Sequence, residues 1–463
     1  MNKKSVFIVL NVFFLALAAY TISLFTRNAD VINPETLVAN SSFKAKTFDT
    51  EVKEVISQKG LKAWLLTERS APIIALNFYF KNAGYAFDEQ GKSGLAMLTA
   101  GMLEYGATNL NNEVYHDLLE ENAIGFDFDV SASNFNVSVI VPAKNLNIAA
   151  DLIKRFLNTP RFSEKNLQIV KERQLEALKL KTENPEKILA SEFKKIFYAS
   201  HPKSNEALGE SSDLLKISVK DLQNFASTHF LANQLVVAIA GDIKTEDAQI
   251  LLDEIFGSLN IAEADYSLPA LEPNYVFEEQ NIERDMPQVL SRFVAHGTIR
   301  LAPDFYALYM ANEIFGGSGL SSRLNVAARE KEGLTYGAYT YLDSEKNAPS
   351  IQGGFATSVE NYSRMREILF EEWHKMAEFG VSKEEFDAVK NNMLTSFNLR
   401  FQSISDIASQ LLYMQKENLG MDFFEKRNEY VNNVTLDDVN QAAHQYFQTL
   451  PSVLTIGNNL KGD

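Results

Sequence analysis

The sequence repeats itself, since its second half resembles its first at a spacing of about 217 residues. Two pairs of segments carry the repeat: 149–167 with 364–386, and 225–241 with 442–457. In the first pair a helical block leads to Ser163 or Ser382, each a suitable N-cap for the long helix that follows. In the second pair a helix end and a polar turn lead to a β-branched strand closed by glycine. An internal duplication into two homologous halves is therefore expected.

The order of strands and helices predicts the fold class. Strand-like segments at 61–66, 73–81 and 289–299 open the halves, and long helical blocks follow each. Without regular βαβ alternation, this indicates α+β halves, each a mainly antiparallel sheet with helices on one face. Phe78, Tyr79 and Phe80 are expected to pack within a sheet. The predicted boundaries are 45–261 for the N-terminal half, 262–281 for a linker with two prolines and no clear period, and 282–460 for the C-terminal half.

The N-terminal segment 1–27 has the pattern of an export signal. Lys3 and Lys4 precede an apolar run over residues 5–25. One interpretation is a cleaved signal peptide with its cleavage site at residues 16–18, and another is an uncleaved membrane anchor. A third interpretation is that the segment forms a buried helix of the soluble fold. Either export interpretation predicts an exported protein, in the periplasm or on the periplasmic face of the inner membrane if the chain is bacterial.

Composition removes several function classes. The 44 Lys and Arg against 60 Asp and Glu give a net charge of −16, which argues against nucleic-acid binding and favours cationic or peptide partners. An acidic wall around a binding site would attract basic peptides. Without cysteine, the chain forms no disulfide, thiol nucleophile, iron–sulfur cluster or cysteine-ligated zinc site. The histidines give no local metal-binding pair, because no two of the six are three to five residues apart: His116, His201, His229, His296, His374 and His444.

A Gly-rich turn in the second half carries a family resemblance. The sequence FGGSGLSSRL at 315–324 is followed by AREKEGLTYGAY at 328–339. Together these closely resemble the matching segment of the pitrilysin/insulinase family of zinc peptidases, in its processing-peptidase branch. The Gly-rich turn at 316–319 lacks P-loop features, so close helix packing or substrate contact is the better interpretation.

The resemblance implies a fold and a role for two residues. It implies two α+β halves that face each other as a clam shell, with Arg329 and Tyr336 hydrogen-bonding the substrate carbonyl and stabilising the oxyanion. The alternative from residue types alone is a surface ion pair for Arg329 and a core position for Tyr336.

The zinc motif of the family is missing. Active members carry H-x-x-E-H on a helix, where two histidines hold Zn²⁺ and the glutamate polarises the attacking water. By resemblance, the histidine positions fall on Met97 and Gly101, the glutamate on Ala100, and the third ligand, a glutamate, on Lys179. None of these residues can bind zinc, so no metal or other cofactor is expected on this chain, and it should not cleave peptides alone.

Three hypotheses of function follow. The first is a non-catalytic, substrate-binding subunit of a heterodimeric zinc metallopeptidase, in which Arg329 and Tyr336 bind peptide substrates while a homologous partner with the zinc motif carries the metal. The second is a structural or peptide-holding scaffold of the same fold with no proteolytic role. The third is an active peptidase with a displaced metal site. The N-terminal segment would serve as a membrane tether if it is uncleaved.

Overall fold

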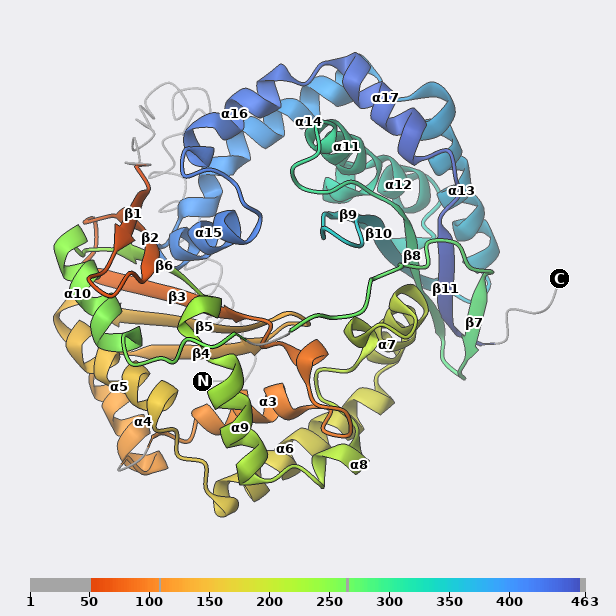
Figure 1. Cartoon of the computed structure of the whole chain (residues 1–463). Helices are drawn as coiled ribbons and strands as arrows, with labels where there is room; N and C mark the ends of the chain where they lie inside the picture. The colour runs from red at the N-terminus through yellow and green to blue at the C-terminus, as the bar shows by residue number, and fades with distance from the viewer. Residues whose placement is uncertain (1–50, 108–109, 264–265, 459–463) are drawn as a thin grey trace, which may run out of the picture. The chain divides into compact units, whose positions relative to one another are not determined.

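The computed structural model describes residues 51–107, 110–263 and 266–458 (Figure 1). The predicted signal or anchor at 1–27 lies outside the described residues. Among the helices that are described, none combines the length and apolar character needed to cross a membrane.

The first half is built on a six-stranded sheet. Its order is β1-β2-β6-β3-β5-β4, in which β2 and β6 run parallel and the other neighbours are antiparallel. The strands are β1 Lys53–Ile56, β2 Lys62–Thr67, β3 Ile73–Lys81, β4 Gly125–Val130, β5 Asn134–Pro142 and β6 Leu235–Gly241.

The second half is built on a five-stranded sheet of order β7-β11-β8-β10-β9. Here β7 and β11 are parallel, and the remaining pairs are antiparallel. Both sheets are therefore mixed, and the order and directions from β2 to β4 in the first correspond to those from β7 to β9 in the second. The strands are β7 Gln280–Glu283, β8 Gln288–His296, β9 Thr335–Asp343, β10 Ser350–Ser358 and β11 Ser452–Gly457. Thus β7 begins at the end of the predicted linker, 262–281.

Helices surround the two sheets (Figure 1). Those of the first half are α3 Leu95–Leu103, α4 Asn112–Glu121, α5 Leu146–Asn158, α6 Glu164–Glu183, α7 Pro185–Tyr198, α8 Ser211–Leu214, α9 Val219–His229 and α10 Thr245–Phe256. Those of the second half are α11 Phe305–Asn312, α12 Arg323–Asn325, α13 Tyr362–Phe379, α14 Lys383–Ser396, α15 Ile404–Lys416, α16 Phe423–Asn433 and α17 Leu436–Tyr446. The predicted caps are confirmed: the Ser163 hydroxyl accepts the Asn166 N–H at the start of α6, and Ser382 caps α14 likewise.

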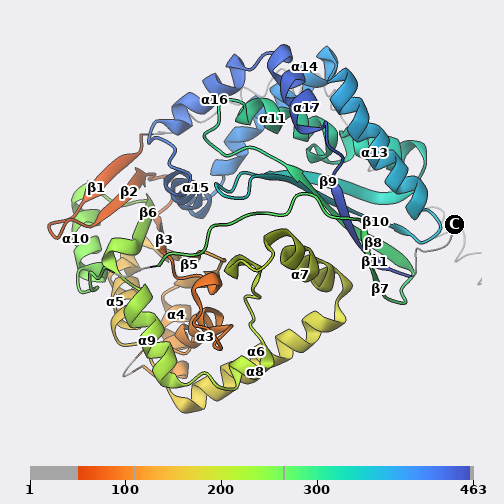
Figure 2. The same ribbon diagram turned by 45° about the vertical axis from the view of Figure 1, so that its right-hand side comes forward.

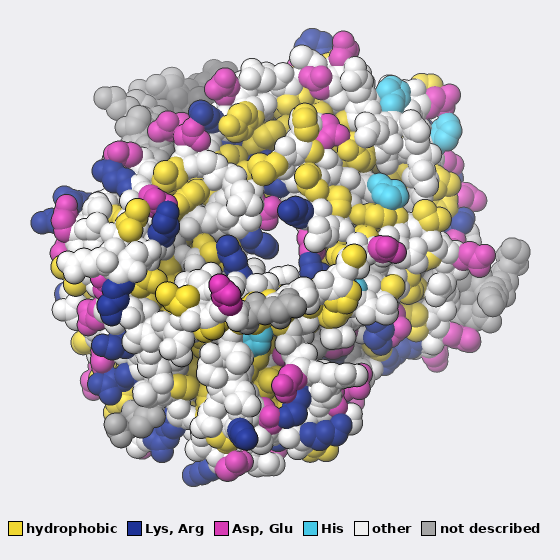
Figure 3. Space-filling model, viewed as in Figure 1, with side chains coloured by type: hydrophobic (Ala, Val, Ile, Leu, Met, Phe, Trp, Pro, Cys, Tyr) yellow, Lys and Arg dark blue, Asp and Glu magenta, His cyan; other side chains and the backbone are white. Residues whose placement is uncertain are grey.

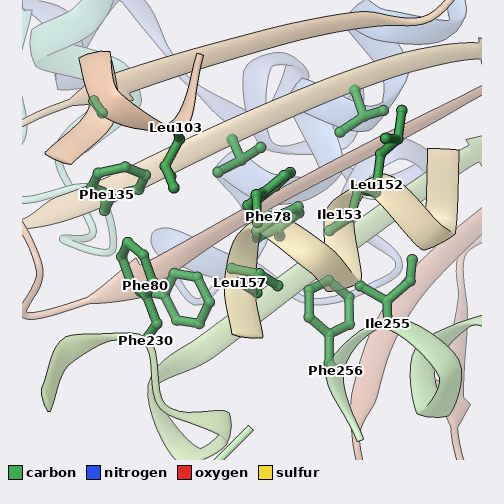
Figure 4. Packing of buried hydrophobic residues seen from close by; sticks show 14 of the residues in the cluster. Phe78, Phe80, Leu103, Phe135, Leu152, Ile153, Leu157, Phe230, Ile255 and Phe256 are labelled. Carbon is green, nitrogen blue, oxygen red and sulfur yellow. The ribbon is translucent and has the colours of Figure 1, made fainter. Parts of the chain in front are cut away.

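The core of the first half lies between its sheet and helices α5 and α10 (Figure 4). Phe78 and Phe80 project from β3 into this core, where their rings lie 5.0 Å from Phe256 and 4.8 Å from Phe230. The predicted packing of the aromatic segment in a sheet is confirmed, since Phe78, Tyr79 and Phe80 are all buried.

Each sheet is also covered on its other face by a helix of the opposite half. Helix α15 lies on β3 and β6, where the Asn77 amide donates to the Ser409 hydroxyl at 3.0 Å. Helix α7 lies on β8 and β11 (Figure 2) and buries Phe197 in a cluster of residues from both halves. The prediction of helices on one face of each sheet was therefore wrong. The reason is visible in β11, whose six residues are all buried, so both of its faces need an apolar neighbour.

Candidate functional site

Helix α3 holds three of the predicted zinc-site positions. Asp88 caps its N-terminus, accepting the Gly94 N–H at 2.7 Å and the Ala96 N–H at 2.9 Å. Ala100 and Gly101 are buried on this helix, and Met97 is half-buried. The structure therefore brings these three positions together, as helical spacing predicts.

Helix α6 lies directly against Gly101. A Cβ built on Gly101 would lie 2.8 Å from Cγ1 of Val170 and 3.1 Å from an Nη of Arg173. The Arg173 guanidinium is also held beside α3, because it donates to the Glu104 carboxylate at 2.9 Å. The space that an imidazole at this position needs is therefore filled by side chains of α6.

Lys179, the predicted third position, is not part of this contact. It follows Arg173 by six residues, about 9 Å along an α-helix, and its side chain is exposed. Sequence reasoning missed Val170 and Arg173 as the residues that meet Gly101. The available signal was a glycine inside a helix, which often marks close packing.

The described residues offer no alternative metal centre. Within 51–107, 110–263 and 266–458, no group of three or more His, Cys, Asp or Glu side chains is placed to hold a metal ion.

Arg329 and Tyr336 stand on either side of one turn. Arg329 lies in a π-helical segment, Val326–Lys331, and Tyr336 is the second residue of β9. Gly333, at φ 65°, reverses the chain between them, and the Leu334 N–H donates to the Ala328 carbonyl at 2.9 Å. The Thr335 hydroxyl fixes the start of β9 by donating to the Ala356 carbonyl at 2.7 Å.

Both side chains are available to a ligand. Tyr336 is 89% exposed, so the alternative of a core position was wrong. Arg329 is half-buried, and in the described part of the chain no ion pair engages its guanidinium. A guanidinium and a phenol on one rigid turn are hydrogen-bond donors suited to a carbonyl oxygen on which negative charge develops.

The Gly-rich turn holds this segment in place. A Cβ on Gly316 would lie 2.6 Å from the Thr340 hydroxyl, so the glycine allows the turn to approach β9. The buried Asn325 exchanges two hydrogen bonds with the Ala338 backbone, at 2.6 and 2.9 Å, and donates to Gly319 at 2.9 Å. Close packing therefore accounts for Gly316, whereas Gly319 has a positive φ of 62° that favours glycine.

A cavity of about 730 Å³ lies between the halves, against α6, α7 and the strands β8 to β10. Its charged wall residues are Lys181, Lys187, Lys194, Arg292, Glu206 and Asp343. Lys181 and Lys194 both pair with Glu206, whereas Lys187 and Arg292 have no carboxylate partner in the described part of the chain. Lys and Arg side chains also border the hollow near the centre of Figure 3. The wall of this cavity therefore carries more Lys and Arg than Asp and Glu, although the chain as a whole is acidic.

Comparison with known proteins agrees with the resemblance drawn from the sequence. Residues 216–393 match the family model described as the peptidase M16 inactive domain. The chain is a relative of the M16 peptidases. This confirms the family resemblance, and the matched segment runs from the end of the first half through the linker into the second.

Individual M16 relatives agree with this assignment. The non-peptidase homolog YmxG of Helicobacter pylori is 25% identical over 85% of this chain and 90% of its own length. Among solved structures, a peptidase M16 inactive domain from Pseudomonas fluorescens superposes with a TM-score of 0.81 at 22% identity, covering 88% of this chain and 98% of that one. A protease from Helicobacter pylori superposes with a TM-score of 0.77 at 17% identity, covering 88% of this chain and 99% of that one. The structures support the fold alone.

Proposed function

We propose that this M16 relative is the non-catalytic, substrate-binding subunit of a heterodimeric zinc peptidase. Its two halves, related by duplication, would face each other as a clam shell around peptide substrates. The N-terminal segment would direct the chain out of the cytoplasm, as a signal peptide or as a membrane tether.

The observation that carries the proposal is a contrast between two parts of the molecule. At the predicted zinc site, Gly101 lies against Val170 and Arg173, with no room for a ligand side chain. At the turn of the second half, Tyr336 is 89% exposed and Arg329 has no ion-pair partner in the described chain. A chain that lacks the metal ligands but presents the carbonyl-binding donors is suited to act with a second chain.

In this proposal, the steps of peptide hydrolysis are divided between the two chains. Zinc on the partner would supply the activated water. On this chain, Arg329 and Tyr336 would orient the substrate carbonyl and donate hydrogen bonds to its oxygen as charge develops there. The cost of losing one such donor is typically a factor of about 10² to 10³ in rate.

The test is to purify this chain alone and together with a co-expressed homologue that carries H-x-x-E-H, and to measure bound zinc and peptide cleavage. The isolated chain should bind no zinc and cleave nothing, and the pair should be active. Arg329→Ala should lower the activity of the pair at least tenfold, whereas the surface control Arg155→Ala should leave it unchanged.

Two results would contradict the proposal. Stoichiometric zinc and cleavage by the isolated chain would make it a peptidase in its own right. A pair whose activity is insensitive to Arg329→Ala would favour the scaffold hypothesis.

A further inference from the structure

A second cavity, of about 610 Å³, lies within the second half, apart from the turn that carries Arg329 and Tyr336. It is bordered by the loop before α11, the start of α11, the loop between α15 and α16, and helices α16 and α17. None of the residues predicted to bind substrate or metal lines it. Its volume is within the range of about 300–1,000 Å³ that is typical of small-molecule sites.

Arg300 forms part of the cavity wall and is only 8% exposed. Its guanidinium donates to the hydroxyls of Tyr413 and Tyr306, each at 3.1 Å. It also lies over aromatic rings, 4.2 Å from the centre of Phe305 and 5.3 Å from that of Phe423. Aromatic rings and neutral hydroxyls thus surround a buried positive charge.

The guanidinium has no carboxylate ion pair among the described residues. Two aspartates line the wall, but their carboxylates accept hydrogen bonds from groups other than the guanidinium. Asp304 accepts the Thr298 hydroxyl at 2.9 Å and the Tyr446 hydroxyl at 2.6 Å. Asp438 accepts the N–H of Thr435, the N-cap of α17, at 2.9 Å and the Thr435 hydroxyl at 2.6 Å. Burial raises the pKa of the Glu417 carboxyl above its ordinary value, and this effect exceeds that of the electrostatic interaction with Arg300, which lowers the same pKa. A buried guanidinium that no carboxylate contacts leaves room for an anion beside it, and pairing with that anion offsets the cost of burying the charge.

The rest of the wall indicates the kind of anion. Phe423 and Leu419 supply apolar surface, and Asn433, Gln441 and Gln445 supply amides that both donate and accept hydrogen bonds. Guanidinium, apolar surface and amides together match a peptide end: a carboxylate, an apolar last side chain and a peptide group.

We infer that this cavity binds the free C-terminal carboxylate of a short peptide whose last residue is apolar. Arg300 pairs with the carboxylate, Phe423 and Leu419 contact the last side chain, and the amides bond the peptide group before it. This site is separate from the carbonyl-binding pair, so it does not depend on the proposed function.

The experiment compares two probes on the purified full chain by titration calorimetry: N-acetyl-Ala-Phe with a free carboxylate, and the same dipeptide as its C-terminal amide. The acid should bind at least tenfold more tightly than the amide. Because this comparison uses the unaltered protein, it does not depend on the folding of a variant.

A matched pair of substitutions tests whether Arg300 binds the carboxylate. Arg300→Lys should weaken binding of the acid at least tenfold, because an ammonium cannot hold both tyrosine hydroxyls and a carboxylate as the planar guanidinium can. Arg427→Lys is the control: Arg427 is also 8% exposed, bonds the Met393 carbonyl at 2.6 Å and stacks on Phe397, but is not part of the wall. Circular dichroism confirms that both variants are folded. Equal binding of acid and amide, no binding of either, or full binding by a folded Arg300→Lys variant would overturn the inference.

Discussion

Gly101 of α3 and Val170 of α6 lie so close that a Cβ on the glycine would be 2.8 Å from Cγ1 of the valine. Real Cβ atoms do not approach other carbons this closely, so the contact requires glycine. The two helices have thus come together at the position where, by family resemblance, an active relative has a histidine. At this position, side chains of α6 occupy the space beside the glycine.

Gly101→Ala is expected to destabilise the protein by about 1–2 kcal/mol, because overpacking outweighs the better helix propensity of alanine. Chemical denaturation measures the change. In a Val170→Ala background the clash is removed, and the same substitution should be neutral or stabilising by up to about 1 kcal/mol. Equal effects in the two backgrounds would show that the two residues do not compete for space.

Restoring only the residues of the H-x-x-E-H motif should not restore zinc binding. The triple variant Met97→His, Ala100→Glu and Gly101→His introduces an imidazole into the space of Val170 and Arg173, and Lys179 still supplies no ligand. Elemental analysis of the folded, purified variant should find less than stoichiometric zinc, and its thermal midpoint should fall. Tight zinc binding with unchanged stability would mean that α6 moves aside easily.

Asn325→Ala should cost about 2–4 kcal/mol of unfolding free energy. The substitution removes hydrogen bonds at 2.6, 2.9 and 2.9 Å and leaves the Ala338 backbone groups unpaired in a buried setting. Asn136→Ala, whose hydrogen bonds to Asp129 are exposed, is the control and should change stability by less than about 0.5 kcal/mol. Similar losses for the two variants would argue against a special role for Asn325.

Asp221 should make stability depend on pH in the acid range. Burial opposes its ionisation, but hydrogen bonds from Lys92 and from Ser218, at 2.7 Å, outweigh burial and lower its pKa to about 2. Because the folded pKa is below the unfolded value of about 3.9, the stabilisation is present above pH 4 and is lost as the pH falls toward 2. Asp221→Asn should therefore be less stable than the parent by about 1–2 kcal/mol at pH 7, and the difference should shrink in acid. A difference that grows in acid would contradict this sign.

Tyr336→Phe tests the phenol without altering the fold. Because Tyr336 is 89% exposed, removal of its hydroxyl should leave the thermal midpoint unchanged. In the active pair, kcat/KM should fall by a factor of about 10² to 10³, the usual cost of one oxyanion donor. Tyr339→Phe, on the same strand and 47% exposed, is the matched control and should have no effect. If both variants behave alike, the phenol at 336 has no special role.

Much of the fold was predictable from local pattern. The caps at Ser163 and Ser382, the buried strand 73–81 and the closing strands of each half follow from signals within a few residues of each other. The coverage of β3 and β6 by α15 was not predictable, because it joins residues far apart: Asn77 of β3 and Ser409 of α15 are separated by 332 positions. A buried strand indicates that a neighbour covers it, but not which helix does so.

The sequence by itself determined the chemistry that is missing, since Met97, Ala100, Gly101 and Lys179 cannot bind zinc in any fold. It also determined the family, through the segment that contains Arg329 and Tyr336. Only the tertiary structure decided that α6 fills the place beside Gly101, that Tyr336 faces solvent, and that Arg300 is buried without a carboxylate partner in the described chain. The physical reason is that ligand chemistry belongs to single side chains, whereas space, exposure and charge balance depend on neighbours that only folding brings together.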